Sequence, residues 1–223
     1  MPARRTGADT VTVYDKAPTE GGTAEYQFEH LRQQSDKASG KPNFSLADFI
    51  SPSDAYTDYI GGFTVSIVGT EALAEKYKAA GDDYNAIMVQ ALSDRLAEAF
   101  AEHLHELIRK DYWGYQADEN LTNDEMIKEK YVGIRPAPGY PACPEHTEKG
   151  KLFEWLGTGE AIGTKLTESY AMWPASSVSG FYYSHPNSEY FNVGKIDRDQ
   201  LEDYATRKDW DMKTAEKWLN PNL

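Results

Sequence analysis

Near the N-terminus, apolar positions alternate with polar ones. Residues 10–14 read Thr-Val-Thr-Val-Tyr, and residues 59–68 are rich in aromatic and β-branched side chains. Both features are typical of strands. We therefore predict strands over these two ranges and strand-like structure over residues 44–50. A polar stretch at residues 21–22, both glycine, predicts a turn, and residues 30–34 predict the start of a short helix.

The apolar period becomes helical between residues 71 and 110. Ala, Leu, Glu, Lys and Gln dominate this stretch, and Gly81 interrupts it before Asp82 and Asp83, which can cap a second, longer helix. On that second helix, apolar side chains recur at three- and four-residue steps, the pattern of a face buried in a core. The predicted core face consists of Met88, Leu92, Leu96, Ala99, Phe100 and Leu104.

Short helices and strands fill the C-terminal half. Thr122 lies three residues before Glu125, a capping-box spacing that predicts a short helix leading to a proline-rich loop. We predict a helix over residues 151–156, then antiparallel strands between residues 165 and 196, where aromatic and β-branched residues gather. Two short capped helices are predicted over residues 197–205 and 212–219. Since no internal repeat or low-complexity linker occurs, this order predicts one α+β domain.

Acidic residues outnumber basic ones. Asp and Glu total 36 against 23 Lys and Arg, which gives a formal net charge of −13. Such a chain repels phosphate backbones and anionic lipid surfaces, so nucleic acid and membranes are not expected partners. No run of about eighteen apolar residues occurs, as a membrane span requires. The one cysteine, Cys143, excludes an intrachain disulfide framework, and we expect a soluble, cytoplasmic protein.

Residues 135–146 combine restricted backbone with groups that can hold a ligand. Four prolines, at 136, 138, 141 and 144, each fix φ and remove an N–H, so this loop must run extended. Gly139 can supply a tight bend. A stiff loop that begins with the Arg135 guanidinium and carries the Tyr140 phenol at its bend is suited to a small anionic ligand. The alternative is a rigid surface connection between two elements.

Two acids on the long helix form a second candidate site. Asp94 and Glu98 are four residues apart, so they share a face on which their like charges repel. Because both continue a stripe begun by Ile87 and Ala91, we expect the stripe to be semi-buried and the acids to bind an ammonium, a sulfonium or an imidazole. The alternative is a pair of solvated acids steadied by basic neighbours, Arg95 or Arg109.

Other reactive side chains favour structural roles. His103 and His105 are two apart on a helix, point to different sides and cannot chelate one ion, so we predict no metal site. Cys143 has no nearby His-Asn arrangement and is expected to be structural. Aromatic residues gather near Trp173, and most should be core, while one or two can stack on a flat ring. They are Tyr182, Tyr183, Tyr190 and Phe191.

Several motifs together resemble the C-terminal activation domain of cobalamin-dependent methionine synthase. The longest is Arg135-Pro-Ala-Pro-Gly-Tyr-Pro-Ala-Cys-Pro-Glu-His-Thr-Glu-Lys. Others are Tyr59-Ile-Gly-Gly-Phe, Asp82-Asp-Tyr-Asn, Asp94-Arg-Leu-Ala-Glu-Ala-Phe-Ala-Glu, Tyr112-Trp-Gly-Tyr, Leu166-Thr-Glu-Ser and Ala171-Met-Trp-Pro. Their order and spacing hold from about residue 2 to Leu223.

The resemblance implies a C-shaped single α+β domain over residues 1–223, with a central twisted antiparallel sheet flanked by helices and a shallow groove for S-adenosylmethionine. Family members carry further residues before the segment that matches Met1, including an acidic residue thought to contact S-adenosylmethionine. The N-terminal part of the family domain is therefore expected to be absent from this chain.

The implied function is reductive reactivation of methionine synthase. In the family, cobalamin oxidises occasionally during homocysteine methylation; flavodoxin or an equivalent reductase supplies an electron, and S-adenosylmethionine then methylates cobalt(I). Cobalt(I) is a strong nucleophile, so no catalytic residue is expected here, and the isolated domain should be inactive without a cobalamin-binding domain. An acidic flavodoxin would need a basic patch. Candidates are Arg109, Lys110, Lys128 and Lys130.

The resemblance also implies residue roles. The family's Arg-x-x-x-Gly-Tyr motif falls on Arg135, Ala137, Gly139 and Tyr140, its helix acid on Glu98, and its aromatic pair on Tyr190 and Phe191, where the second is often tyrosine. All of these are expected to bind S-adenosylmethionine. Asp94 and Tyr140 are expected to meet the cobalamin domain, with Asp94 accepting a hydrogen bond from an imidazole.

Two other functions remain open from the residues. One is an interaction module that docks on a corrinoid protein without binding S-adenosylmethionine. The other, from composition alone, is an aromatic-rich, acidic sugar-binding domain.

Overall fold

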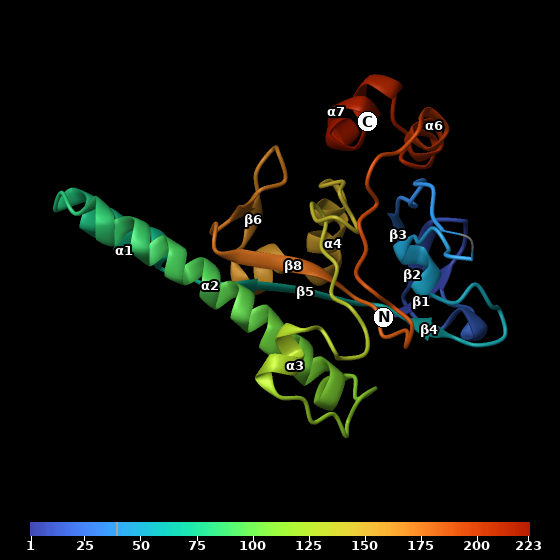
Figure 1. Cartoon of the computed structure of the whole chain (residues 1–223), viewed down its shortest axis with the longest axis horizontal. Coiled ribbons are helices and arrows are strands. Elements are labelled where there is room, and N and C mark those ends of the chain that lie inside the picture. The colour runs from blue at the N-terminus through green and yellow to red at the C-terminus, as the bar shows by residue number, and fades with distance from the viewer. Residues whose placement is uncertain (39) are drawn as a thin grey trace. The chain divides into compact units, whose positions relative to one another are not determined.

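The computed structural model describes residues 1–38 and 40–223, which form two compact units. Unit 1 comprises Met1–Gly61, Val132–Lys151 and Phe181–Leu223, and unit 2 comprises Gly62–Tyr131 and Leu152–Gly180. The strands gather in the first 66 residues and between residues 165 and 182, and the long helices lie between these two groups of strands and at the C-terminus (Figure 1). Within the described ranges, none of the helices combines the length and apolar character needed to cross a bilayer.

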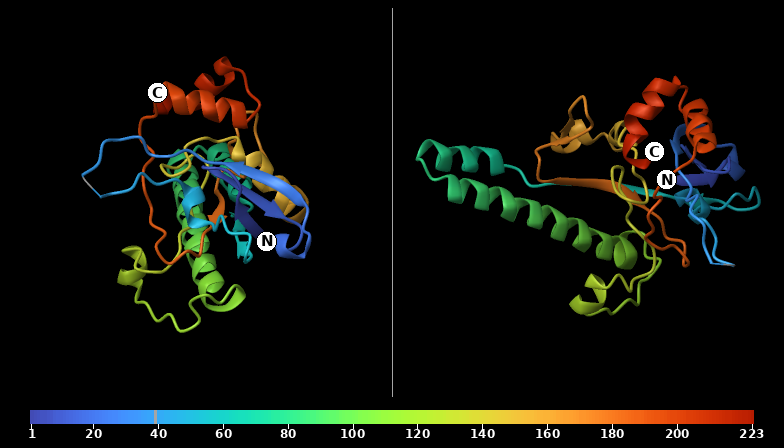
Figure 2. Two further views of the ribbon diagram at one scale, coloured as in Figure 1. Left: turned by 90° about the vertical axis from the view of Figure 1, so that its right-hand side faces the viewer. Right: turned by 45° about the horizontal axis from the view of Figure 1, so that its top comes forward.

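Unit 1 contains a four-stranded antiparallel sheet in the order β3-β2-β1-β4, whose strands lie side by side in Figure 2. The strands are β1 (Pro2–Arg5), β2 (Thr10–Tyr14), β3 (Ala24–Glu29) and β4 (Asp58–Tyr59). The strand predicted over residues 10–14 is confirmed, and every residue of it is buried. Gly21 adopts a left-handed conformation after the 3-10 turn η1 (Pro18–Glu20), which confirms the predicted turn.

Three predictions of local structure in unit 1 are wrong. Residues 30–34 form no helix, because Arg32 bridges Ser45 and its guanidinium binds Asp48. Residues 44–50 form the 3-10 helix η2 (Leu46–Phe49) in place of a strand. Residues 189–196 are extended but pair as no strand. Their apolar side chains instead pack against the C-terminal helices.

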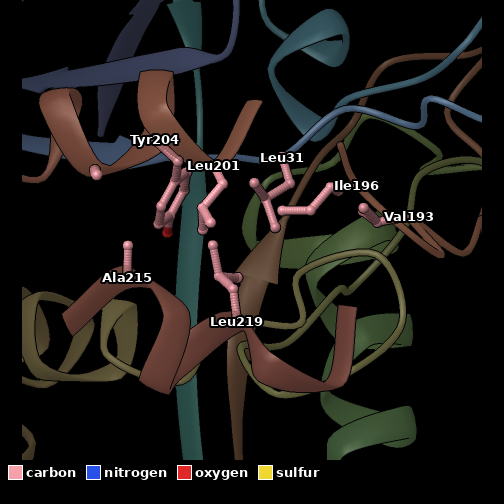
Figure 3. Packing of buried hydrophobic residues seen from close by; sticks show 8 residues of the cluster. Leu31, Val193, Ile196, Leu201, Tyr204, Ala215 and Leu219 are labelled. Atoms are coloured by element: carbon pink, nitrogen blue, oxygen red, sulfur yellow. The ribbon is translucent and has the colours of Figure 1, made fainter. Parts of the chain in front are cut away.

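The two predicted C-terminal helices are confirmed as α6 (Arg198–Arg207) and α7 (Met212–Leu219), followed by the 3-10 turn η4 (Asn220–Asn222). The Asp211 side chain caps α7 by accepting the Thr214 N–H at 2.7 Å. Between the helices lies a cluster of buried apolar side chains (Figure 3). It consists of Leu31, Val193, Ile196, Leu201, Tyr204, Ala205, Ala215 and Leu219.

Unit 2 is built around a helical hairpin and short strands. The hairpin, α1 (Thr70–Ala79) and α2 (Asp83–Leu107), has Asp82 as the N-cap of α2, as predicted. β5 (Gly61–Ser66) pairs with β8 (Ser177–Tyr182), and β6 (Lys165–Leu166) pairs antiparallel with β7 (Met172–Trp173). The other helices are the π-helix η3 (Ile108–Tyr112), α3 (Asn123–Ile127) with the predicted Thr122 capping box, and α5 (Thr158–Ile162). α4 (Glu148–Leu156) begins in unit 1 and ends in unit 2.

The predicted core face of α2 is wrong. Met88, Leu92, Leu96 and Phe100 are 38%, 56%, 58% and 45% exposed. The buried residues of α2 are Ala86, Ser93, Ala97, Ala101 and His105. Most of these are small, so neighbouring backbone can approach closely, and Ser93 accepts a 2.7 Å hydrogen bond from Thr70 at the start of α1. Unit 2 therefore packs on the small side chains of α2 and leaves the large ones outside.

The predicted fold class is confirmed: helices flank antiparallel strands. The strands do not form one central sheet, however. β1, β2, β3 and β4 form one sheet, β5 pairs with β8, and β6 pairs with β7. The assignment of residues 1–223 to one domain stays a prediction.

Candidate functional site

The loop at residues 135–146 is anchored at its start. Ile134 and Tyr183 exchange backbone hydrogen bonds of 2.9 and 3.0 Å, and the Pro136 carbonyl accepts the Phe181 N–H at 2.9 Å. Proline has no backbone N–H and can only accept a backbone hydrogen bond, which Pro136 does here through its carbonyl oxygen. All of these residues belong to unit 1. The loop thus begins along a buried segment that holds its direction.

A compact bend follows. Gly139 has φ of 95°, a conformation that other residues rarely adopt, so the predicted bend at Gly139 is confirmed. Three backbone hydrogen bonds close it: Tyr140 N–H to Ala137 O at 3.1 Å, Cys143 N–H to Tyr140 O at 2.9 Å, and Gly139 N–H to Cys143 O at 2.7 Å. The bend leaves the Tyr140 side chain 57% exposed while Ala137 is buried. It therefore presents a phenol to the surroundings.

Gly139 also lies against the His146 ring. A Cβ at this position would come within 2.4 Å of His146 Cε1. We expect Gly139→Ala to lower the free energy of unfolding by about 1–3 kcal/mol, because it adds backbone strain and a steric clash. Urea unfolding measures this. The control is Gly21→Ala, where φ is 75° but nothing lies within 4 Å of the added Cβ. Equal losses in the two variants would show that the His146 clash contributes nothing.

Arg135 and Tyr190 come together in unit 1. The Arg135 main-chain N–H donates to the Tyr190 hydroxyl at 3.0 Å, and Arg135 itself is half-buried. Tyr190 thereby fixes the backbone from which the guanidinium projects. Of the predicted ligand residues, the structure brings together Arg135, Ala137, Gly139, Tyr140 and Tyr190; their role in binding stays a prediction.

Phe191 is engaged in packing. The centroid of its ring lies 6.0 Å from the ring centroid of Phe44 and 6.4 Å from that of Phe49. Phe191 also packs against the C-terminal apolar cluster. Tyr182 and Tyr183 are buried, which confirms that these two aromatic residues are core. A hydroxyl is not needed for the packing of Phe191, which is why phenylalanine suits this position.

A buried network of charges holds the far end of the loop. Lys208, at the end of α6, is 5% exposed and pairs with Glu148 and with Glu145, the latter at 3.3 Å. Glu145 also accepts hydrogen bonds from Tyr204 at 3.1 Å and from Thr147 Oγ1 at 2.7 Å. The sequence reasoning missed this network. Its one local signal was the pair of acids at 145 and 148, and Lys208 is about sixty residues away.

The pKa values of this network follow from burial and charge. Burial raises the pKa of Glu148, against the attraction of Lys208. Burial alone would lower the pKa of Lys208, but Glu148 and Glu145 outweigh it and raise that pKa. Burial, together with the same two acids, raises the pKa of the Cys143 thiol far above its ordinary value. The thiol therefore stays protonated and unreactive, as its predicted structural role requires.

Asp94 and Glu98, the two candidate acids of α2, belong to unit 2. The prediction that their side of the helix is semi-buried is wrong. Ile87 is 66% exposed, and Asp94 and Glu98 are exposed as well. Glu98 pairs with Arg95 at 2.7 Å, the arrangement of the alternative interpretation, while Asp94 accepts a hydrogen bond from Ser176 at 2.6 Å. The ligand roles assigned to Asp94 and Glu98 stay predictions.

Arg109 cannot belong to a basic docking patch. It is 1% exposed, forms two 2.7 Å hydrogen bonds with Glu119, and lies 4.4 Å from the centroid of the Tyr131 ring. The sequence prediction failed because helical position alone does not reveal a partner ten residues further on. Lys110, Lys128 and Lys130 remain candidates for such a patch.

The two histidines of α2 point to different sides, as predicted: His103 is 62% exposed and His105 is buried. Across residues 1–38 and 40–223, no group of three His, Cys, Asp or Glu side chains is placed to hold a metal ion.

The protein-family model described as the activation domain of vitamin B12 dependent methionine synthase matches residues 1–209 of this chain. The chain belongs to this family. The match covers both compact units, and it confirms the resemblance read from the loop motifs. Among solved structures, this activation domain is similar to a MetH reactivation domain bound to AdoHcy, with 54% identity and a TM-score of 0.94. That similarity covers 100% of this chain and 68% of the other.

Proposed function

We propose that this activation domain binds S-adenosylmethionine on the loop at residues 135–146 and presents its methyl group to cobalamin carried by another domain. The reaction reactivates methionine synthase by reductive methylation. One observation carries the proposal: the whole chain is 54% identical to a reactivation domain that binds AdoHcy. AdoHcy is the molecule that S-adenosylmethionine becomes when it loses this methyl group.

The loop offers groups that suit the ligand. The Arg135 guanidinium can clamp the carboxylate of the methionyl part with two parallel hydrogen bonds. Its backbone is held by Tyr190, so little order has to be gained on binding. We assign the contacts around the rest of the ligand to Ala137, Gly139 and Tyr140 from the loop and to Glu98 and Phe191, with Glu98 taking the ammonium.

The domain's task is orientation. Reduced cobalamin, held by a separate domain, would supply the nucleophile and its electron pair. The methyl carbon leaves sulfur, and the electron pair of the broken C–S bond returns to sulfur, so AdoHcy forms and no proton moves. A general base is therefore unnecessary, and the residues of this chain contribute by holding the sulfonium methyl in line. Tyr140, exposed at the bend, would separate donor and acceptor until they align.

The partners follow from this chemistry. A cobalamin-binding domain of methionine synthase must dock on the activation domain, and flavodoxin or an equivalent reductase must deliver an electron, for which Lys110, Lys128 and Lys130 offer positive charge. With Cys143 as its one cysteine, the chain suits a reducing compartment, so we place the reaction in the cytoplasm.

The experiment mixes this chain with a separately produced cobalamin-binding domain, a reductant and methyl-labelled S-adenosylmethionine. We expect label to reach cobalamin only when both proteins are present. Docking of the two proteins without methyl transfer would favour the alternative, an interaction module that does not bind S-adenosylmethionine.

Asp94→Asn tests the contact with the cobalamin domain. We expect S-adenosylmethionine affinity to stay within about twofold and methyl transfer to slow by about tenfold or more, the usual cost of losing a hydrogen bond to a charged group. The same labelled assay measures both. Glu75→Gln, an exposed acid on α1, is the control and should change neither. Unchanged transfer by Asp94→Asn would remove the assigned contact.

A further inference from the structure

The His146 ring packs against the bend of the candidate loop, although it has no part in the proposed methyl transfer. Its Nδ1–Cε1 edge faces Gly139, since a Cβ added to Gly139 would lie 2.4 Å from Cε1 and 2.7 Å from Nδ1. Both residues belong to unit 1. The bend that this ring touches carries three of the residues assigned to the ligand, Ala137, Gly139 and Tyr140.

The backbone that carries the His146 ring is held on both sides. Glu145 accepts a 2.7 Å hydrogen bond from Thr147 Oγ1, so the residues that flank His146 are joined to each other. The Glu145 carboxylate also accepts from Tyr204 at 3.1 Å and pairs with Lys208 at 3.3 Å, both on α6. The base of the ring is therefore fixed, and the bend is the part that can yield when the ring changes.

The buried side of the imidazole suits the neutral ring. Nδ1 of His146 is buried, and it has no hydrogen-bond partner in the part of the chain that the structure describes. In the neutral ring with its proton on Nε2, Nδ1 is an unused acceptor, whereas in the imidazolium both nitrogens are donors. A buried charged N–H without an acceptor is much the costlier of the two. Protonation therefore favours a conformation in which Nδ1 reaches water.

The charged neighbours of His146 do not offset this cost. Lys149, which is 6% exposed, adds positive charge, and the oxygens of Glu145 already bond to Thr147 and to α6. Burial and the charge of Lys149 lower the pKa of His146 below its ordinary value of 6.5, against the attraction of Glu145. The packed, neutral ring is therefore fully populated above pH 6.5, and the packing is lost as pH falls through the lowered pKa.

We propose that His146 is a positioning residue for S-adenosylmethionine. Its neutral ring holds the bend at Gly139 and Tyr140 in the shape that binds the ligand, and protonation of the ring releases the bend and weakens binding. This inference rests on the proposed function of the loop and adds a pH dependence to it.

Calorimetric titration with AdoHcy, the molecule bound by the similar solved domain, tests this in the wild type, His146→Phe and His146→Gln. Neither replacement takes up a proton, while the ligand and the rest of the site titrate equally in all three proteins. Between about pH 7.5 and about pH 5.5, we expect the dissociation constant of the wild type to rise about three- to tenfold more than that of either variant, because one linked proton changes affinity by at most tenfold per pH unit.

His103→Phe is the matched control for the titration. His103 is 62% exposed on α2, and its replacement should leave the wild-type pH profile unchanged.

Hydrogen exchange of the ligand-free chain gives a second readout. The Gly139 N–H donates to the Cys143 carbonyl at 2.7 Å, so its protection factor reports whether the bend is closed. We expect this factor, which is corrected for the intrinsic effect of pH, to fall over the same pH range in the wild type and to stay constant in His146→Phe and His146→Gln.

The outcomes separate this inference from the proposed function. Equal changes of affinity in the wild type and the variants, or equal changes of Gly139 protection, would overturn the role of His146 and leave ligand binding by the loop intact. Absence of AdoHcy binding at both pH values would instead remove the proposed function, and this inference with it.

Discussion

Replacing Lys208 by methionine is expected to lower the free energy of unfolding by about 3–5 kcal/mol, the range for removing one partner of a buried ion pair. The change would remove the buried cation shared by Glu148 and Glu145, both almost fully buried, and leave Glu148 with the more exposed Lys151 at 3.4 Å. Urea unfolding at neutral pH measures the loss. Lys213→Met, an exposed lysine of α7, is the matched control and should change stability by less than about 0.5 kcal/mol.

The pH dependence separates this electrostatic cause from lost packing. Because the folded pKa of Lys208 is raised, its contribution is fully present below the unfolded pKa of about 10.5 and is lost as pH rises through the folded pKa. In Lys208→Met, protonation of Glu148, whose pKa burial already raises, should restore part of the stability as pH falls. A loss of stability that is the same at every pH would contradict this explanation.

Replacing Arg135 by alanine is expected to weaken binding of S-adenosylmethionine by about 10- to 150-fold, the cost of losing hydrogen bonds to a charged group. Arg135→Lys keeps the charge but not the planar pair of donors, so its loss should be intermediate. Equilibrium dialysis with labelled ligand measures all three proteins.

Arg198→Ala is the matched control for that series. Arg198 is an exposed guanidinium on α6, and its loss should leave affinity unchanged. If Arg135→Ala bound the ligand as tightly as Arg198→Ala, the carboxylate clamp would have to be assigned elsewhere.

The limits of α2 followed from local signals, whereas its packing did not. Gly81 and the Asp82 cap are encoded within a few residues, so the helix begins where the sequence predicted. Its buried face depends on which neighbours approach it, and close approach favoured Ala97 and Ser93 over Leu92 and Leu96. Hydrophobic periodicity identifies an apolar face but not whether this chain contains the partner that covers it.

Long-range contacts explain the other differences. The sequence around Arg32 predicted the start of a short helix, but the ion pair between Arg32 and Asp48 holds this segment in an irregular conformation. In the candidate site, the bend at Gly139 was predictable because prolines and a glycine restrict the backbone locally. The ion-pair network of Lys208, Glu145 and Glu148 was not predictable, because its members meet only after α6 packs on the loop.

Calorimetric titration of this chain with AdoHcy measures directly whether residues 135–146 form a site for S-adenosylmethionine. We expect saturable heat at a stoichiometry near one, from a chain whose fold is intact by circular dichroism, and a large loss of affinity in Arg135→Ala. A folded chain that gives no heat at about millimolar ligand, the limit of useful affinity for so small a molecule, would contradict the claim that residues 135–146 form a site for S-adenosylmethionine.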